Sequence, residues 1–417
     1  MNVRLASWSQ PASPARALVA AALALVVFGA SWGLVHTGFY RHDQVVDTPV
    51  YQNYGDAIAS GRVPYRDFGL EYPPAALPAF AIPSLLRSPP GDLDAYRRGF
   101  EIEMVVCGQL AVLFVLAALL SLEAGPLRFG LALGFAALTP LLIGSVVLTR
   151  FDLWPAALTA GTLAALLAGR EKLASGALGV AVAAKLYPLV LVPVAGAWIW
   201  RRSGRRRALA SLAVFAAVVL ALFVPFLVLA PHGLWGSITR QTGRPLQIES
   251  LGAGVLLVLH QAAGTAITMQ SSHGSQNLVG SLPHALAIAS TVLQGLAVIG
   301  VWVWFVRGPA ERDRLARAFA AAVCAFVAFG KVFSPQFLIW LVPLVVLVRG
   351  RRGIAAGGIF ALALVLTQLW FPFRYWDLAL RFDALSSWLV LARDLVVVGL
   401  FAMLLLSPPQ PRLLRRA

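Results

Sequence analysis

The sequence predicts an all-α polytopic membrane protein, and three observations lead to this fold class. Only 12% of the 417 residues are charged and 59% are hydrophobic, whereas soluble domains carry about 25% charged residues. Apolar runs of roughly 18 to 25 residues recur along the chain, and each could cross a bilayer as a helix. Because unpaired backbone groups are not tolerated in lipid, we expect these runs to be helical.

The arginines predict how these helices are oriented. The net charge is +16, and short basic segments separate the apolar runs at 201–207, 307–317, 349–352 and 412–416. The positive-inside rule places such segments in the cytoplasm and explains the charge without nucleic acid. Anionic membrane lipids at the same surface are the alternative explanation. We therefore expect a multi-pass protein of a prokaryotic plasma membrane with a cytoplasmic C-terminus.

The first apolar run, about 17–38, is longer than the core of a signal peptide and predicts a first membrane helix. It leads into an extracytoplasmic loop, 39–97. Within that loop, Thr48 followed by Pro49 predicts a short juxtamembrane helix with Thr48 as its N-cap, and Gly61 ends it. The proline-rich run that follows, up to residue 97, predicts an interfacial or re-entrant segment, because prolines disfavour a spanning helix.

The rest of the chain alternates predicted spans with short links. The expected spans are 98–121, 128–148, 153–169, 208–230, 283–306, 314–331, 334–349, 353–371 and 385–406. The run 173–200 is too short for two spans and has Lys185 and Pro188 near its centre, so two half-helices are predicted to meet there and line a cavity. The polar stretch 232–282 is expected to be a second long extracytoplasmic segment, with a non-spanning apolar piece at about 251–266. Together these give a single integral membrane domain, 1–417, with about 10–12 transmembrane helices.

Polar residues from distant segments fall on the outer side of this predicted topology. Asp47 stands just before the predicted helix start, where the helix dipole favours an ionised carboxylate that could accept a proton from a hydroxyl. Lys185 and Lys331 lie in apolar runs, where an unpaired charge costs about 2.5–3.5 kcal/mol. Each is expected either to bind a substrate anion or to form a structural ion pair.

Other polar groups are expected to have structural roles, or no role in a disulfide or metal site. Asp56 and Asp67 are expected to shape and solvate the first loop, and Arg393 with Asp394 is expected to be a structural pair. The two cysteines lie inside apolar runs and the six histidines are scattered, so the spacing predicts neither a disulfide framework nor a metal site. We expect no metal and no cofactor.

Five segments carry a resemblance to a known family. They are VVDTPVYQNYGDAIASGRVPYRDFGLEYPP (45–74), TRFDLWPAAL (149–158), GVAVAAKLYPLVLVP (179–193), GRPLQIESL (243–251) and GKVFSPQFLIWLVP (330–343). In this order the chain resembles the GT-C superfamily of membrane glycosyltransferases and, more closely, glycosyltransferase family 87, which contains polyprenyl-phosphate-mannose-dependent mannosyltransferases. The resemblance implies a polyprenyl-phosphate sugar donor, inversion at the anomeric carbon, transfer on the outer face, and a catalytic Asp that maps onto Asp47.

The sequence and the resemblance together predict an inverting hexosyltransferase, most simply a mannosyltransferase, with a lipid or glycan as acceptor. Asp47 is the candidate general base. Cations are expected on the donor phosphate, and other polar side chains on the sugar. The candidate substrate-binding residues are Glu71, Arg150, Asp152, Lys185, Tyr187, Glu249, Lys331 and Gln336.

Rival functions remain at this point. An arabinofuranosyltransferase is the alternative within the enzyme class. A transporter or flippase of a lipid-linked substrate would also need a cavity and intramembrane cations, but duplicated halves are typical of such proteins and no long internal repeat is visible in this chain. A non-catalytic scaffold or sensor of membrane assembly is the third class, and it predicts that replacing Asp47 changes nothing.

Overall fold

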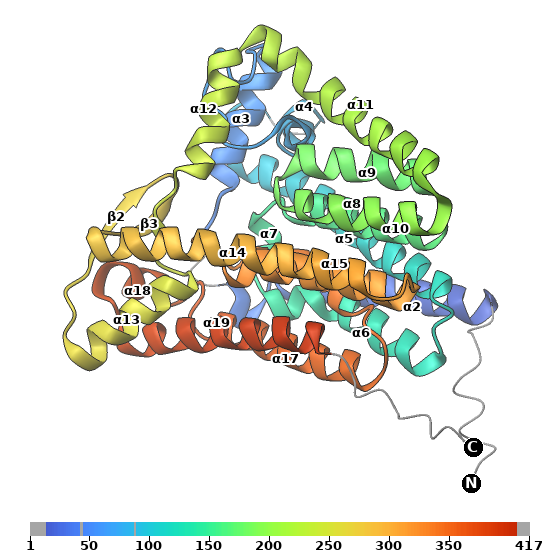
Figure 1. Cartoon of the computed structure of the whole chain (residues 1–417). Helices are drawn as coiled ribbons and strands as arrows, with labels where there is room; N and C mark the ends of the chain where they lie inside the picture. The colour runs from blue at the N-terminus through green and yellow to red at the C-terminus, as the bar shows by residue number, and fades with distance from the viewer. Residues whose placement is uncertain (1–13, 42–44, 87–88, 407–417) are drawn as a thin grey trace, which may run out of the picture.

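The computed structural model describes residues 14–41, 45–86 and 89–406. Most of this part is helical, and the long helices lie roughly side by side (Figure 1). By length and composition, seven described helices could cross a membrane. They are α2 (Pro14–Leu34), α5 (Leu93–Ser121), α6 (Pro126–Ile143), α11 (Arg205–Leu229), α14 (Ser281–Arg307), α17 (Gly350–Gln368) and α19 (Ala384–Leu405). The predicted all-α polytopic membrane fold is confirmed.

Shorter elements complete the bundle. The short α-helices are α3 (Thr48–Ala59), α4 (Leu77–Leu86), α7 (Val146–Thr149), α8 (Leu153–Leu167), α9 (Glu171–Ala184), α10 (Val192–Ser203), α12 (Pro231–Thr242), α13 (Leu251–Ala263), α15 (Arg312–Ala328), α16 (Phe337–Val345) and α18 (Tyr375–Arg381). The 3-10 helices are η1 (Gly38–Arg41), η2 (Pro74–Ala76) and η3 (Tyr187–Leu191). Every segment that was predicted to be helical contains a helix.

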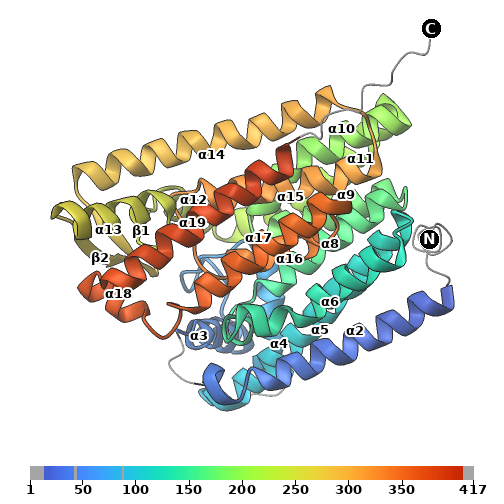
Figure 2. The same ribbon diagram turned by 90° about the horizontal axis from the view of Figure 1, so that it is seen from below.

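The bundle has two different ends, which both views separate clearly (Figures 1 and 2). One end carries α3, α12, α13, α18 and a small β-sheet, and we call it the sheet end. The other end carries the turns from α8 to α9, from α10 to α11 and from α14 to α15, and we call it the arginine end. The predicted basic segments 201–207 and 307–317 both lie at the arginine end.

Several helices between these ends are too short to run the full length of the bundle. At 1.5 Å per residue, α8, with 15 residues, spans roughly 22 Å, and α9, with 14 residues, spans roughly 21 Å. By the same rise α11, with 25 residues, spans roughly 37 Å. Both α8 and α9 join at the arginine end, so their far ends stop inside the bundle. The residues just before α8 and just after α9 therefore lie deeper in the bundle than the sheet end.

The break predicted at Lys185 and Pro188 is confirmed. Helix α9 ends at Ala184, Lys185 is extended with ψ near 143°, and the 3-10 helix η3 begins at Tyr187. Pro188 has no N–H to donate, so the hydrogen-bond ladder of α9 cannot continue through it. The chain therefore reverses at this point, and α10 returns it to the arginine end.

The segment 232–282 contains the predicted apolar piece as α13, and it also contains a sheet that was not predicted. It folds into α12, α13 and a three-stranded antiparallel sheet of β1 (Leu246–Gln247), β2 (Thr268–Ser272) and β3 (Ser275–Val279), with β3 in the middle. Leu246 pairs with Leu278 in this sheet. The strands are only two to five residues long, which left too little alternation in the sequence to predict them.

The start of α3 also differs from the prediction by one residue. The N-cap is Asp47 rather than Thr48, and Pro49 lies in the first turn. The Asp47 side chain makes no capping hydrogen bond, because its carboxylate is engaged elsewhere. Thr48 is buried instead, and its hydroxyl accepts a hydrogen bond from Arg97 Nε at 3.3 Å.

Burial separates a central helix from peripheral ones. In α15, every residue from Ala318 to Ala325 is buried, and a helix that is apolar all round belongs in a core. In α11, by contrast, Ser211 is the one buried residue. The apolar surface of α11 therefore faces outward, as expected for a helix in contact with lipid.

A buried ion pair inside α19 anchors the sheet end. Arg393 and Asp394 are both fully buried, and Arg393 Nε lies 2.7 Å from Asp394 Oδ1. The guanidinium also stacks on Phe333, 3.8 Å from the ring centroid, and its Nη2 donates to the backbone oxygen of Glu249 at 2.6 Å. The predicted structural role of this pair is confirmed by these contacts.

We expect Arg393→Ala to destabilise the protein by about 3–5 kcal/mol, because it leaves the Asp394 charge buried without a partner. The measurement is the free energy of unfolding in detergent. The matched control is Arg381→Ala, since Arg381 is 80% exposed and pairs with Asp377 at 3.4 Å on the surface. An exposed pair contributes little. Equal effects of the two substitutions would contradict the assigned role.

Candidate active site

The predicted site residues come from turns that the fold brings to one region. These turns are 45–47 before α3, 150–152 before α8, 185–186 after α9, 244–249 around β1, and 329–336 between α15 and α16. Electrostatic contacts join them, because Glu249 and Tyr375 each interact with both Arg150 and Arg244. The distant segments of the sequence therefore form one cluster.

The candidate base Asp47 is paired with Arg150. Arg150 Nη1 forms an ion pair with Asp47 Oδ2, and the Tyr51 hydroxyl donates to the same oxygen at 3.3 Å. Arg150 Nη2 donates to the backbone oxygen of Val45 at 3.2 Å. No described residue donates to Asp47 Oδ1, and the side chain remains 32% exposed. One carboxylate oxygen is thus fixed, and the other is open to a substrate.

This pairing changes what Arg150 can do. Its side chain is only 7% exposed, and its charge is compensated by Asp47. The prediction placed Arg150 on the donor phosphate. The contacts instead suit it to hold Asp47 ionised and in a fixed orientation, since a neighbouring cation favours the charged form of a carboxylate.

A second ion pair joins three helices. Asp152 Oδ1 accepts hydrogen bonds from Lys185 Nζ and from Trp340 Nε1, both at 2.6 Å. Asp152 is 1% exposed and Lys185 is 15% exposed. The ammonium also lies over the rings of Phe151 at 4.6 Å and Trp340 at 5.1 Å. Of the two alternatives raised for Lys185, the structural ion pair is the one that the geometry supports.

Tyr187 lies behind this pair. Its ring stacks on Trp340 with centroids 4.1 Å apart, and its hydroxyl is within 2.8 Å of Thr159 Oγ1 and 3.2 Å of the Pro155 oxygen. It is 1% exposed. These contacts position the Trp340 ring and leave the Tyr187 hydroxyl no open side toward the cluster.

Glu249 is a buried carboxylate with one oxygen unused. The Gln247 side chain and Ser334 Oγ, the latter at 3.4 Å, donate to Oε2, whereas Oε1 has no partner. Burial raises the pKa of Glu249 to about 7, although Arg393 and Arg150 oppose the shift. This carboxyl group can therefore be neutral or ionised near neutral pH, with Oε1 available to a hydroxyl.

Lys331 differs from its prediction. It was expected inside an apolar helix, but α15 ends at Ala328 and Lys331 lies in the connection that follows. Its Nζ donates to the backbone oxygen of Thr242 at 2.8 Å, and it forms no ion pair within the described residues. Burial and the nearby Arg244 lower its pKa. The helix ends early because Gly330 and Pro335 follow closely.

Arg244 belongs to the cluster although it was not among the predicted site residues. Nη2 donates to Ser275 Oγ of β3 at 2.9 Å, and Nε is buried without a partner. Burial lowers its pKa, while Tyr72, Glu71 and Glu249 oppose the shift. No carboxylate lies within ion-pair distance in the described part of the chain. The available signal was its place in the segment 243–251.

Glu71 and Gln336 both retain free polar groups. The Glu71 carboxylate lies against the β2–β3 turn, since a Cβ added to Gly274 would lie 3.6 Å from both of its oxygens. It forms no ion pair in the described residues. Gln336 is the N-cap residue of α16, and its side chain makes no hydrogen bond to any described residue. Both groups are available to a ligand.

The other carboxylates of the first loop are occupied. Asp56 accepts from Ser84 Oγ at 2.8 Å and from the Gly91 N–H at 3.0 Å. Asp67 pairs with Arg66 at 2.8 Å, and this contact lowers its pKa to about 2. These contacts agree with the predicted loop-shaping role. Across the described residues, no group of three His, Cys, Asp or Glu side chains could hold a metal ion.

Comparisons with known proteins give one family. The model of glycosyltransferase family 87 matches residues 70–335, which include the predicted site residues except Asp47 and Gln336. No curated protein matches the chain in sequence. A similar solved structure is that of ArnT from Cupriavidus metallidurans in the apo state. It has 17% sequence identity and a TM-score of 0.45, with 93% of this chain and 76% of that chain covered.

The buried Glu249 carboxyl group makes the stability depend on pH in a specific way. Its folded pKa of about 7 exceeds the roughly 4.3 of an exposed glutamate. Between about pH 4 and pH 7 the folded state therefore binds more protons than the unfolded state. The contribution of Glu249 to the free energy of unfolding is fully present below about pH 4 and is lost as the pH rises to about 7.

We expect Glu249→Gln, which mimics the neutral form, to remove this dependence. The measurement is the unfolding temperature of both proteins from pH 5 to pH 8. Wild type should lose stability relative to the variant as the pH rises. A difference between the two proteins that does not change with pH would contradict the assigned protonation.

Proposed function

Because the chain belongs to glycosyltransferase family 87, we propose that it transfers a sugar, most simply mannose, from a polyprenyl-phosphate donor to a hydroxyl of a lipid or glycan acceptor. The glycosyltransferase class follows from the family. The donor, the sugar, the inversion and the base are part of the proposal. No observation favours a transporter or a scaffold over this class.

One observation carries the proposal. Asp47 Oδ2 is held by Arg150 and Tyr51 while Oδ1 stays open. In the proposed reaction, the acceptor oxygen bonds to the anomeric carbon as the bond from that carbon to the phosphate oxygen breaks. The hydroxyl proton passes to Asp47 Oδ1, and the bonding electrons leave with polyprenyl phosphate. A phosphate is a good leaving group, so this step uses one carboxylate rather than the pair of a glycosidase.

Cations without carboxylate partners are the best candidates for holding the donor phosphate. Arg150 and Lys185 are compensated by Asp47 and Asp152. Arg244 and Lys331 are near each other and have no ion-pair partner among the described residues. A guanidinium can bind a phosphate through two parallel hydrogen bonds, and the Arg244 Nε is unused. Of the three predicted candidates for the phosphate, we therefore keep Lys331 and replace Arg150 and Lys185 by Arg244.

The sugar has candidate partners beside this phosphate. Glu249 Oε1 is unused, and Glu71 and Gln336 carry free polar groups. Asp152 and Tyr187 act indirectly in this proposal, because they fix Lys185 and Trp340. Mannose and arabinofuranose remain distinguishable by experiment, since an assay with each polyprenyl-phosphate sugar reports which one turns over.

We also propose that the sheet end faces the outside of a prokaryotic plasma membrane and that the C-terminus is cytoplasmic. The basic turns at the arginine end support this orientation. A cysteine placed at Arg66 should react with an impermeant thiol reagent added to intact cells, whereas one placed at Arg206 should react after lysis alone. The reverse pattern would refute the orientation.

We expect Asp47→Asn to lower kcat by a factor on the order of 10²–10⁴, the usual contribution of a general base. The variant keeps the shape and can still accept from Tyr51, so donor binding should change little. The measurement is steady-state turnover with polyprenyl-phosphate mannose.

Three variants of other carboxylates in the same loop serve as comparisons for Asp47→Asn. Asp56→Asn and Asp67→Asn change carboxylates of the same loop and should stay within a few-fold of wild type. Glu71→Gln tests the other free carboxylate, and we expect it to raise KM more than it lowers kcat. Normal turnover by Asp47→Asn together with an inactive Glu71→Gln would move the base to Glu71.

We expect Arg244→Ala and Lys331→Ala each to raise the donor KM by about tenfold or more, because each removes a charge-assisted hydrogen bond of about 1.5–3 kcal/mol. Arg240→Ala is the control, since Arg240 is exposed and donates to Gly236 of its own helix. Lys185→Ala should instead reduce the yield of folded protein, because Asp152 loses its partner. An unchanged donor KM in both Arg244→Ala and Lys331→Ala would contradict the assignment of the phosphate to these two residues.

A further inference from the structure

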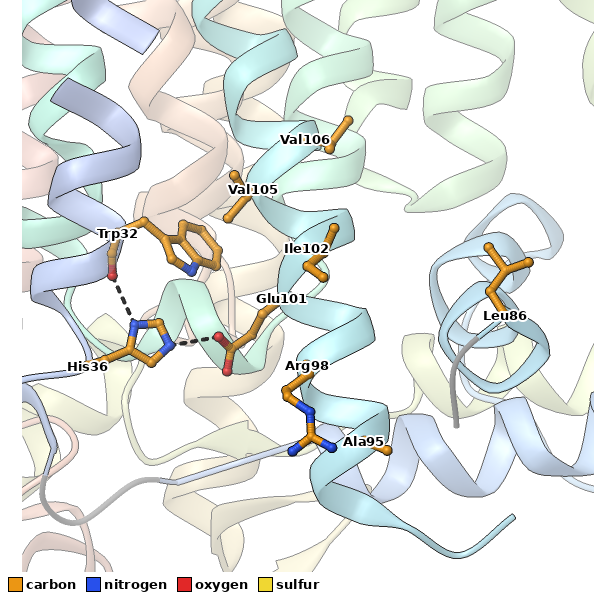
Figure 3. A pocket seen from close by; sticks show the side chains of 9 residues that line it. All are labelled: Trp32, His36, Leu86, Ala95, Arg98, Glu101, Ile102, Val105 and Val106. Carbon is orange, nitrogen blue, oxygen red and sulfur yellow. Dashed lines mark hydrogen bonds and ion pairs between the residues drawn. The ribbon is translucent and has the colours of Figure 1, made fainter. Parts of the chain in front are cut away.

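A pocket of about 810 Å³ lies between α2, α4 and the first half of α5, apart from the candidate active site (Figure 3). Its walls come from the end of α2, from the last residue of α4 and from one face of α5. The lining residues are Trp32, His36, Leu86, Ala95, Arg98, Glu101, Ile102, Val105 and Val106.

Close packing elsewhere on α5 explains why this space is open. Gly108 lets the Phe28 ring of α2 contact the α5 backbone, since a Cβ at this position would overlap the ring. Gly99 likewise allows Pro83 of α4 to pack closely against α5, because a Cβ added to Gly99 would lie only 3.2 Å from the Pro83 Cβ. The helices touch at these two glycines, and the pocket is the wedge left between the contacts.

The pocket changes from polar to apolar along α5. Arg98 and Glu101 come first, and Ile102, Val105 and Val106 follow at helical spacing on the same side (Figure 3). From Arg98 to Val106 the helix rises roughly 12 Å. Both α2 and α5 are long enough to cross a membrane, and the polar end lies where α2 ends and α5 begins. This order matches a headgroup region followed by acyl chains.

The polar end of the pocket carries an arginine without a partner among the described residues. His36 Nε2 lies 2.7 Å from Glu101 Oε2, and Nδ1 lies 3.1 Å from the Trp32 backbone oxygen. Both ring nitrogens thus face oxygen atoms, and the Glu101 carboxylate is engaged by His36 rather than by Arg98. Arg98 is exposed and forms no hydrogen bond or ion pair with any described residue. One guanidinium therefore remains uncompensated at the mouth of an apolar wedge.

We propose that this pocket binds one anionic phospholipid of the surrounding bilayer, with its phosphate at Arg98 and an acyl chain along Ile102, Val105 and Val106. Trp32 is at the height expected for an aromatic residue of the membrane interface. The neighbouring Arg97 turns away from the pocket and donates to Thr48 beside Asp47. The lipid site and the candidate base therefore lie on different sides of α5, and this proposal does not depend on the proposed reaction.

Native mass spectrometry of the full chain in detergent tests the proposal. The probes are dioleoylphosphatidylglycerol and dioleoylphosphatidylcholine, which share acyl chains and differ in headgroup charge. We expect one phosphatidylglycerol to be retained about tenfold more tightly than phosphatidylcholine. Arg98→Ala should abolish this difference, and Ile102→Trp, which fills the wedge, should weaken both lipids. Arg381→Ala replaces another exposed arginine and should behave as wild type.

Two outcomes would overturn the assignment. Equal retention of phosphatidylglycerol by Arg98→Ala and Arg381→Ala would mean that the phosphate is not held at Arg98. Displacement of the bound phospholipid by one equivalent of polyprenyl phosphate, together with a raised donor KM in Arg98→Ala, would make the occupant the lipid-linked donor instead. Retention of phosphatidylglycerol by Arg98→Lys, which keeps the charge, would support a direct ionic contact.

Discussion

The hydrogen-bonded ion pair between Asp152 and Lys185 is the interaction on which the candidate site depends. Asp152 begins α8, Lys185 ends α9, and Trp340 of α16 donates to the same carboxylate oxygen. A buried charge without its partner costs several kcal/mol, so these three helix ends are held together. Because α8 and α9 are short, the junction lies below the sheet end, and the polar groups around it form the cluster of the candidate site.

The cluster contains two kinds of cation. Arg150 and Lys185 are each compensated by an aspartate, and they hold the position of Asp47 and of the helix ends. Arg244 and Lys331 have no carboxylate at ion-pair distance in the described residues, and both are held by single hydrogen bonds to neighbouring turns. The first kind organises the site, and the second kind remains free to bind an anion. This division is a physical reason for placing the donor phosphate at the second kind.

Much of the fold could be predicted from the sequence, because each membrane helix is encoded by a long apolar run and the break at Pro188 is a local effect. The small sheet could not, since its strands are short and their pairing joins residues far apart in sequence. In the site, the segments were recognised and an ion pair was one of the two predicted alternatives for Lys185, but the pairing of Arg150 with Asp47 was not predicted. Which aspartate compensates Arg150 or Lys185 depends on how helices pack, and no spacing within one segment reports it. Arg244 was missed for the same reason.

We propose that a lipid phosphate binds at Arg244 and Lys331, in the cluster that contains Asp47. The most direct test of this proposal is an experimental structure of the Asp47→Asn variant with polyprenyl-phosphate mannose bound, in lipid nanodiscs. The account predicts density for the phosphate against the Arg244 guanidinium and Lys331 Nζ, with the anomeric carbon facing residue 47. Phosphate density at Arg150 or Lys185, with the Asp152 pair opened, would contradict it.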